Sequence, residues 1–342
     1  MQQTQIDLVI SWVDGNDYQW LQARAAARNK TIQYSEGLNH PARFREIGLL
    51  KYAFRSIEKN LPWVRNIYLV TPGQIPAWLN KDHPKVKVVD QNTIIPKDYQ
   101  PCFKSTGVEW HLHRIPGLSE NFIYINDDMI FTQPLTPKDF FHKGLPRLTA
   151  IYHPLPIADF SHMVLSTLNV LNRNFIQGKI AHRNINKFFN PLNGRLYLRN
   201  IIYRSLDRFS SRESLQSSYI FPHVALPLRK STLETIWEKE FNALDATCRN
   251  PFRDKSDIII WLAMFWEIES GTFVPQNPAT TQLIYANELE ILKKTLNDKS
   301  VSMLCLNDTE NIETLSETMI DRIDKLMNLK FPKISSFETI QK

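Results

Sequence analysis

The sequence has few cysteines and few glycines, and it has no apolar stretch long enough to cross a membrane. Cys102, Cys248 and Cys305 are far apart and odd in number, which argues against a disulfide framework or a structural zinc site. The longest apolar stretch, residues 258–266, is far shorter than the ~20 residues of a membrane-spanning helix. The first residues also lack the basic and apolar regions of a signal peptide. We therefore expect a cytoplasmic protein, either soluble or bound peripherally to the cytoplasmic face of the inner membrane.

Several familiar motifs are absent as well. The chain has no P-loop, no GxSxG, no GxGxxG and no HExxH, so the chemistries that depend on them lose support. It also lacks internal repeats and low-complexity segments. With 342 residues, it is long enough for one elaborated domain or two small ones.

The formal net charge of +6 comes largely from one region, residues 170–215. Only Asp207 and Glu213 are acidic there, against the cations Arg173, Lys179, Arg183, Lys187, Arg195, Arg199, Arg204, Arg208 and Arg212. Such a region attracts a phosphate-rich polymer, an anionic membrane surface or nucleic acid. The alternative is a solvated helical face with no specific ligand.

Strand and helix patterns alternate in the first half of the chain. Short apolar runs predict strands at residues 6–13, 67–71, 86–89 and 122–125, and amphipathic patterns predict helices at 42–61 and 107–115. This alternation predicts an α/β fold with a mainly parallel, doubly wound, Rossmann-like sheet. The second half predicts a basic helical insertion and a helical C-terminal part. Its expected helices are one through Leu233, Trp237, Phe241 and Leu244, a buried one at 258–268, and a final one at 312–326.

Acidic residues follow two of the predicted strands. Asp127 and Asp128 come after the run 122–125, where two carboxylates can hold Mg²⁺ together with substrate phosphates. Asp14, followed by Gly15 and Asn16, ends the first strand and could bind a ribose, a base or the metal. The alternative for both groups is a polar turn that satisfies its own backbone.

Two further groups could carry chemistry. Glu109 and His113 are four residues apart and would share a helical face, with Arg114 beside them as a cation for phosphate. His223 could act as a general base, while Arg253 could bind a phosphate with two parallel hydrogen bonds. Nothing in the sequence alone brings His223 or Arg253 to Asp127.

Four segments in order resemble the conserved regions of the Stealth family of sugar-phosphate transferases. The first is IDLVISWVDGNDYQW. The second comprises RFREIGLLKYAFRSIEKNLPWVRNIYLVTPGQIPAWLN and VEWHLHRIPGLSENFIYINDDMIFTQPLTPKDFF. The third comprises FPHVALPLRKSTLETIWEKEF and NPFRDKSD, and the fourth is LCLNDTEN. The family includes bacterial capsule-polymer transferases and an animal enzyme that places N-acetylglucosamine-1-phosphate on lysosomal glycoproteins.

The resemblance implies roles for particular residues on a glycosyltransferase-A-like sheet. Glu109 and Asp127 match acidic active-site residues, Asp128 stands beside them, and His223 and Arg253 match the histidine and arginine of the third region. Glu109, Asp127 and Asp128 are the implied ligands of Mg²⁺ or Mn²⁺. The candidates for substrate binding are Asp14, Asn16, Arg55, Gln74, Arg114, Asp257 and Asn307. The animal enzyme has Asn at the position of Asp14, so a carboxylate is not obligatory there.

The implied reaction transfers hexose-1-phosphate, for example N-acetylhexosamine-1-phosphate, from a UDP-sugar to a glycan or phosphodiester-polymer acceptor in capsular polysaccharide synthesis. UMP leaves and a phosphodiester forms, and the expected partners include the capsule assembly machinery but no nucleic acid. The main alternative is a conventional metal-dependent glycosyltransferase that releases UDP. A nucleic-acid or membrane-binding module is a second alternative, against which the acidic residues argue.

The same reading divides the chain into two parts. Residues 1–158 and 216–342 are expected to form the α/β catalytic core. Residues 159–215 are expected to form the basic insertion, which either recognises the acceptor or faces the membrane. No linker rich in Gly, Ser or Pro separates the parts.

Overall fold

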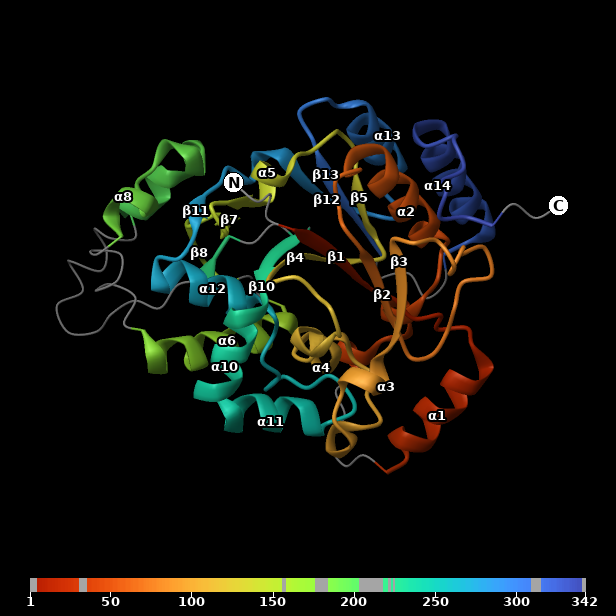
Figure 1. Cartoon of the computed structure of the whole chain (residues 1–342), viewed down its shortest axis with the longest axis horizontal. Helices are drawn as coiled ribbons and strands as arrows, with labels where there is room; N and C mark the ends of the chain where they lie inside the picture. Colours follow the sequence, from red (N-terminus) through yellow and green to blue (C-terminus); the bar gives the residue numbers. More distant parts are fainter. Residues whose placement is uncertain are drawn as a thin grey trace.

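The computed structural model describes residues 5–30, 36–155, 158–175, 184–202, 218–220, 223, 225–308 and 315–339. At its centre lies a five-stranded sheet in the order β10-β4-β1-β2-β3 (Figure 1). The first four strands in sequence run parallel, and β10 is antiparallel to β4. Their bounds are Ile6–Ser11 for β1, Ile67–Thr71 for β2, Val86–Asp90 for β3, Asn121–Asn126 for β4 and Leu226–Arg229 for β10. The predicted mainly parallel α/β sheet is therefore confirmed.

Both faces of this sheet are covered, which explains the nearly continuous apolar runs in its strands. On β1, Leu8 and Ile10 belong to the core cluster that contains Phe54 of helix α2 (Leu49–Asn60). Val9 points to the other face and belongs to the cluster that contains Trp110. Because successive side chains alternate between faces, one strand contributes to both cores.

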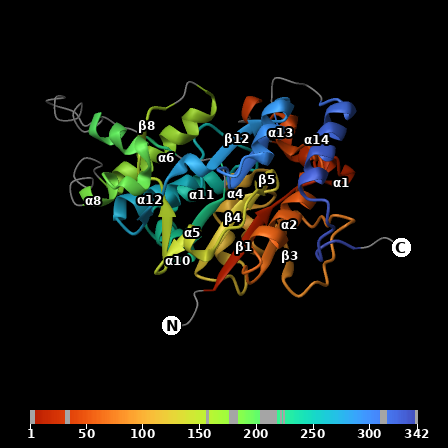
Figure 2. The same ribbon diagram turned by 90° about the horizontal axis from the view of Figure 1, so that it is seen from above.

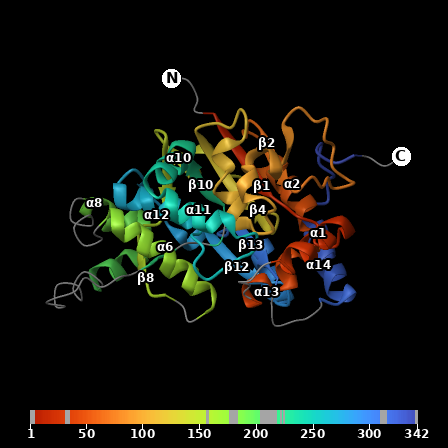
Figure 3. The same cartoon turned by 90° about the horizontal axis from the view of Figure 1, so that it is seen from below.

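Helices gather on each side of the sheet (Figures 1–3). Helix α14 contacts both α2 and α13 on one side, whereas α11 contacts α10 and α4 on the other. Helices α6 and α8 lie at the end of the molecule opposite to α14 and β3. The helix bounds are α1 (Tyr18–Arg28), α3 (Gln91–Ile94), α4 (Ser105–Glu109), α5 (Pro137–Phe140), α6 (Phe160–Asn174), α8 (Ile185–Phe188), α10 (Lys230–Lys239), α11 (Phe241–Arg249), α12 (Trp261–Ser270), α13 (Leu289–Asn297) and α14 (Glu317–Lys330).

The C-terminal part contains the expected helices together with strands that the sequence patterns did not predict. A second sheet has the order β12-β13-β5, a third has the order β11-β7-β6, and β8 pairs with β9. The bounds are β5 (Met129–Phe131), β6 (Phe141–His142), β7 (Leu145–Leu148), β8 (Tyr152–His153), β9 (Ser218–Tyr219), β11 (Val274–Pro275), β12 (Thr281–Tyr285) and β13 (Met303–Asn307). Strand β13 is mostly buried, and it pairs with β5, which directly follows the turn at Asp127 and Asp128.

Three helix predictions were also wrong in detail. The helix expected at 42–61 begins only at Leu49, because Gly48 has a left-handed conformation with φ of 81° and residues Pro41–Phe44 form a separate 3₁₀ turn. The stripe from Leu233 to Leu244 is divided between α10 and α11 at Glu240. The helix expected at 107–115 ends at Glu109 and is followed by a short 3₁₀ turn.

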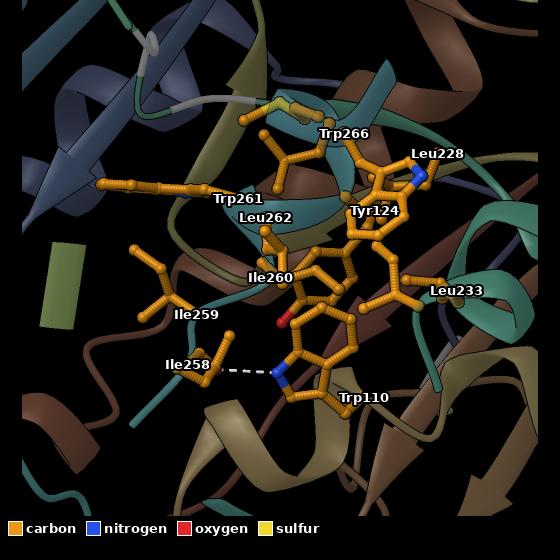
Figure 4. Packing of buried hydrophobic residues seen from close by; sticks show 14 of the residues in the cluster. Trp110, Tyr124, Leu228, Leu233, Ile258, Ile259, Ile260, Trp261, Leu262 and Trp266 are labelled. Atoms are coloured by element: carbon orange, nitrogen blue, oxygen red, sulfur yellow. Dashed lines mark hydrogen bonds between the residues drawn. The ribbon is translucent and has the colours of Figure 1, made fainter. Parts of the chain in front are cut away.

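The break after Glu109 has a packing cause. The indole of Trp110 is fully buried, and its Nε1 donates a hydrogen bond to the carbonyl oxygen of Ile258 at 2.7 Å (Figure 4). Its own carbonyl accepts from Trp237 Nε1 at 2.7 Å. The first bond joins the segment after α4 to the residues that lead into α12, the helix that the sequence correctly predicted to be buried, and the second joins it to α10. This packing determines where Glu109 lies.

The basic insertion is only partly included in the described residues. Within 159–215, these comprise 159–175 and 184–202, while Lys179, Arg183, Arg204, Arg208 and Arg212 lie outside them. Some of its cations have protein partners. Arg173 forms an ion pair with Glu240 at 2.6 Å, and Lys187 donates to the carbonyl oxygen of Phe273 at 2.9 Å. Across the described part of the chain, no helix is long and apolar enough to span a membrane.

Candidate active site

Three loops meet at the carboxyl edge of the central sheet. They follow β1, β2 and β4, whose ends are neighbours because Ser11, the last residue of β1, pairs with both Val70 and Asn126. Asp14 and Gln74 join the first two loops. The Asp14 backbone N–H donates to Gln74 Oε1 at 2.7 Å, and Gln74 Nε2 donates back to the Asp14 carbonyl at 3.0 Å. The structure thus brings together two residues that the sequence proposed separately.

The segment before α2 packs closely against the first loop. A Cβ on Gly15 would lie 1.9 Å from the carbonyl oxygen of Phe44, so only glycine fits there without a shift of backbone. Glu46, two residues further on, accepts hydrogen bonds from the Trp12 indole and from the backbone N–H of Gly48. Burial raises the pKa of Glu46, and the nearby Asp14 carboxylate raises it further. Sequence reasoning missed Glu46, because a glutamate near the start of an amphipathic stripe looks like a surface helix residue.

Asp127 and Asp128 form the two-residue turn between β4 and β5. Burial raises the pKa of Asp127 well above its ordinary value, and the carboxylates of Asp128 and Glu46 raise it further. Burial also raises the pKa of Asp128, whereas His223 and the Cys305 thiol act in the opposite direction. Neighbouring carboxylates that repel one another in a half-buried turn favour a bound cation.

His223 reaches this turn through the antiparallel pairing of β10 with β4. Leu226 pairs with Tyr124, so the residues before β10 lie beside those that follow β4. One ligand atom each from Asp128, His223 and Cys305 lies within 4.8 Å of the other two. Among the described residues, no other group of three or more His, Cys, Asp or Glu side chains meets that distance. The ring of His223 also lies edge-on to Trp261, with 6.4 Å between ring centroids.

Glu109 and Arg253 form a second group. Arg253 Nη2 donates to Ser105 Oγ at 3.0 Å, and Tyr124 donates its hydroxyl proton to Glu109 Oε1 at 3.1 Å. Burial lowers the pKa of Arg253 to about 10, with further lowering from Arg43, although Glu109 and Asp257 act to raise it. Burial raises the pKa of Glu109 and Arg253 lowers it. Arg253 Nη1 is buried and has no hydrogen-bond partner among the described residues, so it is available to an anion.

Tyr124 connects the two groups. Its hydroxyl lies 3.1 Å from Asn126 Oδ1 as well as from Glu109, and Asn126 directly precedes Asp127. The structure therefore places Glu109 with Arg253 and Tyr124, whereas Asp128 lies with His223 and Cys305. Glu109 is not a member of the cluster that holds Asp128.

Several of the other predicted substrate ligands have structural partners. Arg55 forms a bidentate ion pair with Glu338 at 2.7 and 2.8 Å, and Asp257 forms a buried ion pair with Lys104 at 2.8 Å. Arg114 is exposed on the 3₁₀ turn after α4. Burial lowers the pKa of His113 to about 4, and the predicted shared helical face with Glu109 was wrong because α4 ends between them.

Asn16 lies in the loop that follows β1, and Asn307 lies at the end of β13. The Asn16 side chain is exposed, while its backbone N–H donates to Asp14 Oδ1 at 2.9 Å. Asn307 is the last residue of β13 and is partly buried. The residue that follows it, Asp308, forms an ion pair with Arg45 at 3.0 Å.

A pocket lies next to the segment that carries His223. Ile220 and Ala225, the described residues on either side of His223, both line it. Polar side chains from β7, β12 and the loop after β11 complete the wall together with apolar residues of β10 and α12. The polar lining residues include Arg147, Thr149, Gln276 and Thr281.

Comparison with known proteins agrees with this arrangement. Models of the Stealth protein conserved regions 1 and 2 match residues 4–32 and 43–148. A capsular polysaccharide phosphotransferase, WcwK of Streptococcus pneumoniae, is 37% identical over 338 residues, which cover 97% of this chain and 98% of WcwK. The chain belongs to the Stealth family. As a Stealth protein it is a transferase.

Two further relatives also align over nearly their full length. The exopolysaccharide phosphotransferase cps2G of Lactiplantibacillus plantarum is 34% identical to this Stealth protein. The alignment covers 97% of this chain and 96% of cps2G. The receptor polysaccharide phosphotransferase WefC of Streptococcus gordonii is 35% identical, and the alignment covers 97% of this chain and 98% of WefC. Among solved structures, the galactosyltransferase LgtC in complex with donor and acceptor sugar analogs aligns over 96% of this chain and 98% of its own, with 10% identity and a TM-score of 0.40. That similarity is too weak to indicate a function.

Proposed function

We propose that this Stealth protein transfers hexose-1-phosphate from a UDP-sugar to an acceptor sugar hydroxyl in capsular polysaccharide synthesis. The observation that carries the proposal is the convergence of Asp128 and His223, nearly a hundred residues apart in sequence, at the carboxyl edge of the sheet. Its relatives WcwK, cps2G and WefC are named as polysaccharide phosphotransferases, which supports the same reaction class.

The reaction couples one bond formed to one bond broken. The acceptor oxygen attacks the β-phosphorus of the donor, and the bond from that phosphorus to the oxygen shared with the α-phosphate breaks. UMP leaves with the shared oxygen, and the acceptor proton passes to an imidazole nitrogen of His223. The anomeric C–O bond is untouched, so the sugar keeps its stereochemistry in the phosphodiester product.

Arg253 supplies positive charge to the donor diphosphate. Its buried Nη1 lacks a partner among the described residues, and its Nη2 is held by Ser105. A guanidinium in this position donates to phosphate oxygens as charge builds on the transferred group and on UMP. Glu109 positions Arg253 through their mutual attraction, and Tyr124 in turn holds Glu109.

A divalent metal fits the acidic turn. Asp128 Oδ1 is buried without a hydrogen-bond partner among the described residues, and the pKa of Asp127 is raised by burial and further by the carboxylates of Asp128 and Glu46. A hard cation, which prefers oxygen ligands, would give Asp128 Oδ1 a partner and would offset the repulsion between the carboxylates. We propose that Asp127 and Asp128 hold Mg²⁺ or Mn²⁺, which would neutralise charge on the donor diphosphate. Glu109, which the sequence also suggested as a ligand, is better suited to positioning Arg253.

The acceptor would approach from the side of the pocket next to His223. The polar groups of Arg147, Thr149 and Gln276 can hydrogen-bond a sugar, while the apolar wall can pack against its ring. Part of the basic insertion, including Arg195 and Arg199, would attract a phosphodiester polymer through its charge. Replacing Arg195 and Arg199 with Glu should raise the KM for a polymeric acceptor and leave the KM for the donor unchanged.

Identification of the nucleotide product separates this reaction from its alternative. Purified protein, Mg²⁺, a panel of UDP-sugars and an oligosaccharide acceptor should yield UMP in a one-to-one ratio with a phosphodiester, detected by chromatography and by phosphorus NMR. A conventional glycosyltransferase would yield UDP and a product without phosphorus. Stoichiometric UDP would therefore refute the proposal.

A further inference from the structure

The cluster of Asp128, His223 and Cys305 offers nitrogen and sulfur ligand atoms, which Mg²⁺ does not need, beside a carboxylate oxygen. Cys305 lies on β13, is fully buried, and donates its thiol proton to Asp128 Oδ2 at 3.1 Å. Mg²⁺ binds oxygen ligands, whereas thiolate and imidazole ligands select zinc and related thiophilic ions. Neither the sequence patterns nor the names of the relatives assign a role to Cys305.

The backbone holds two of these residues in fixed positions. Strand β13 pairs with β5 so that Cys305 lies opposite Met129, the residue after Asp128. The backbone N–H of Leu306 donates to the Asp128 carbonyl at 2.9 Å. The carboxylate and the thiol therefore approach one another because of the sheet and not through a chance rotamer. His223 reaches the same place from the other side, through the pairing of β10 with β4.

The unused atoms of the cluster point to a ligand. Asp128 Oδ1 is buried and unpartnered among the described residues, although its companion oxygen accepts from the thiol. The three ligand atoms lie within 4.8 Å of one another. In a tetrahedral zinc site, with bonds of about 2.0 to 2.3 Å, ligand atoms lie about 3.3 to 3.8 Å apart. Side-chain rotations that move the ligand atoms about 1 Å closer together are enough to reach that geometry.

We propose that Asp128, His223 and Cys305 form a binding site for a thiophilic divalent cation of the zinc class, and that its occupation inhibits the enzyme. On binding, the Cys305 thiol gives its proton to solvent and the sulfur becomes a metal ligand. One nitrogen of His223 and one oxygen of Asp128 complete the set of three protein ligands, and a water fills the fourth position.

The inhibitory effect rests on the proposed function. A His223 nitrogen that coordinates zinc has no lone pair for the acceptor proton, and Asp128 cannot serve zinc and Mg²⁺ in the same way at once. Zinc would therefore compete with both parts of the proposed mechanism. The site differs from a structural zinc site built on paired cysteines, which the sequence argues against, because it uses one residue from each of three distant segments.

Cobalt spectroscopy tests the site independently of turnover. Co²⁺ replaces zinc in such sites and shows a near-ultraviolet thiolate charge-transfer band together with visible bands of tetrahedral coordination. The full chain, freed of metal with a chelator, should bind one equivalent of Co²⁺ with both features, and added Zn²⁺ should abolish them. Cys305→Ser should lose the charge-transfer band. Cys248→Ser removes a buried cysteine on α11 and is the matched control that should keep the band.

A second variant guards against misfolding of the first. His223→Ala keeps the thiol and should retain the charge-transfer band, but with Co²⁺ affinity at least about tenfold weaker because a ligand is lost. The absence of the band in the unmodified protein, or its persistence in Cys305→Ser, would overturn the proposed site. Unchanged Co²⁺ affinity in His223→Ala would remove His223 from it.

Turnover measurements then test the inhibition. With Mg²⁺ in excess, zinc should inhibit the unmodified enzyme, and Cys305→Ser should need at least about tenfold more zinc for the same fractional loss of its own activity. Normal turnover by protein that shows the full cobalt bands, or in which zinc has displaced them, would overturn the inhibitory role while leaving the site intact. If no transferase activity is found with any donor, the proposed function fails, and the cobalt spectra still decide whether the site exists.

Discussion

The Arg253→Lys substitution tests the proposed phosphate contact most directly, because the structure holds this residue by its backbone. Asn39 Oδ1 accepts from the Arg253 backbone N–H at 3.0 Å, and Asn39 Nδ2 donates to the Arg253 carbonyl at 2.9 Å. Neither bond involves the side chain that would be replaced. A lysine at position 253 should therefore keep the local fold and the positive charge while losing the planar guanidinium.

The magnitude follows from the hydrogen bonds that remain possible. Arg253 donates through Nη2 to Ser105, and its Nη1, which has no partner in the described part of the chain, can donate to a phosphate oxygen. A lysine ammonium cannot make both hydrogen bonds with the same geometry. Loss of one charge-assisted hydrogen bond costs about 1.5 to 3 kcal/mol. At about 1.4 kcal/mol for each factor of ten, kcat/KM for the donor should fall by about 10-fold to about 150-fold.

The assay compares this variant with a matched one outside the site. Arg229 forms a bidentate pair with Glu267, with both hydrogen bonds at 2.7 Å, so Arg229→Lys also removes a guanidinium fork. Arg229→Lys should lower the free energy of unfolding in urea but change kcat/KM by less than about threefold. If Arg253→Lys also changes kcat/KM by less than threefold, Arg253 does not bind the donor phosphate and the assignment is wrong.

Three other predictions concern the base, the metal and a buried carboxyl group. His223→Ala should lower kcat by a factor of about 10² to 10⁴ while UDP-sugar binding, measured by calorimetry, persists; a smaller loss of kcat would give the role of base to another group. Chelation should abolish activity and Mg²⁺ should restore it, and because burial and like charges raise the pKa of Asp127, protons should compete with Mg²⁺ at a higher pH than for an exposed aspartate. The Mg²⁺ concentration for half-maximal activity should therefore rise as the pH falls, starting at a higher pH than for an exposed aspartate, and full activity in chelator would exclude the metal. Burial raises the pKa of Glu269 from 4.5 to about 7, so the folded state holds this proton more tightly than the unfolded state, and stability should fall by at most about 3 kcal/mol as pH rises across that interval. Glu269→Gln should lack that fall in urea unfolding measurements, whereas Gln in place of the exposed Glu238 should not change the pH dependence.

Much of the fold could be predicted because its strands are buried on both faces. Strand β2 spans the predicted residues 67–71, and β1, β3 and β4 differ from prediction by at most two residues at an end. A parallel strand covered by helices on both sides must be apolar throughout, so local composition is enough to reveal it. Strands β12 and β13 were not predicted, although α13 joins them in a parallel strand–helix–strand unit. Strand β12 is mostly not buried and has no continuous apolar run that would reveal it.

The candidate site was predictable only in part. That Asp14 and the Asp127–Asp128 pair lie at the same edge follows from the sequence, since both groups follow parallel strands of one sheet. Arg55 and Asp257 showed the same charge pattern as functional residues, yet they form ion pairs with Glu338 and Lys104. A charged side chain has the same appearance in a sequence whether its partner is a substrate or another residue.

The amino-acid sequence by itself determined the parallel sheet, its buried strands and the acidic turn at its edge, because hydrophobic periodicity and strand-end residues act over a few neighbours. Only the tertiary structure decided what surrounds that turn. The antiparallel pairing of β10 with β4 brings His223 to Asp128, and the pairing of β13 with β5 brings Cys305 to the same carboxylate. These contacts depend on strand order and direction, which are set by how whole elements bury their apolar faces against one another and leave no local mark in the chain.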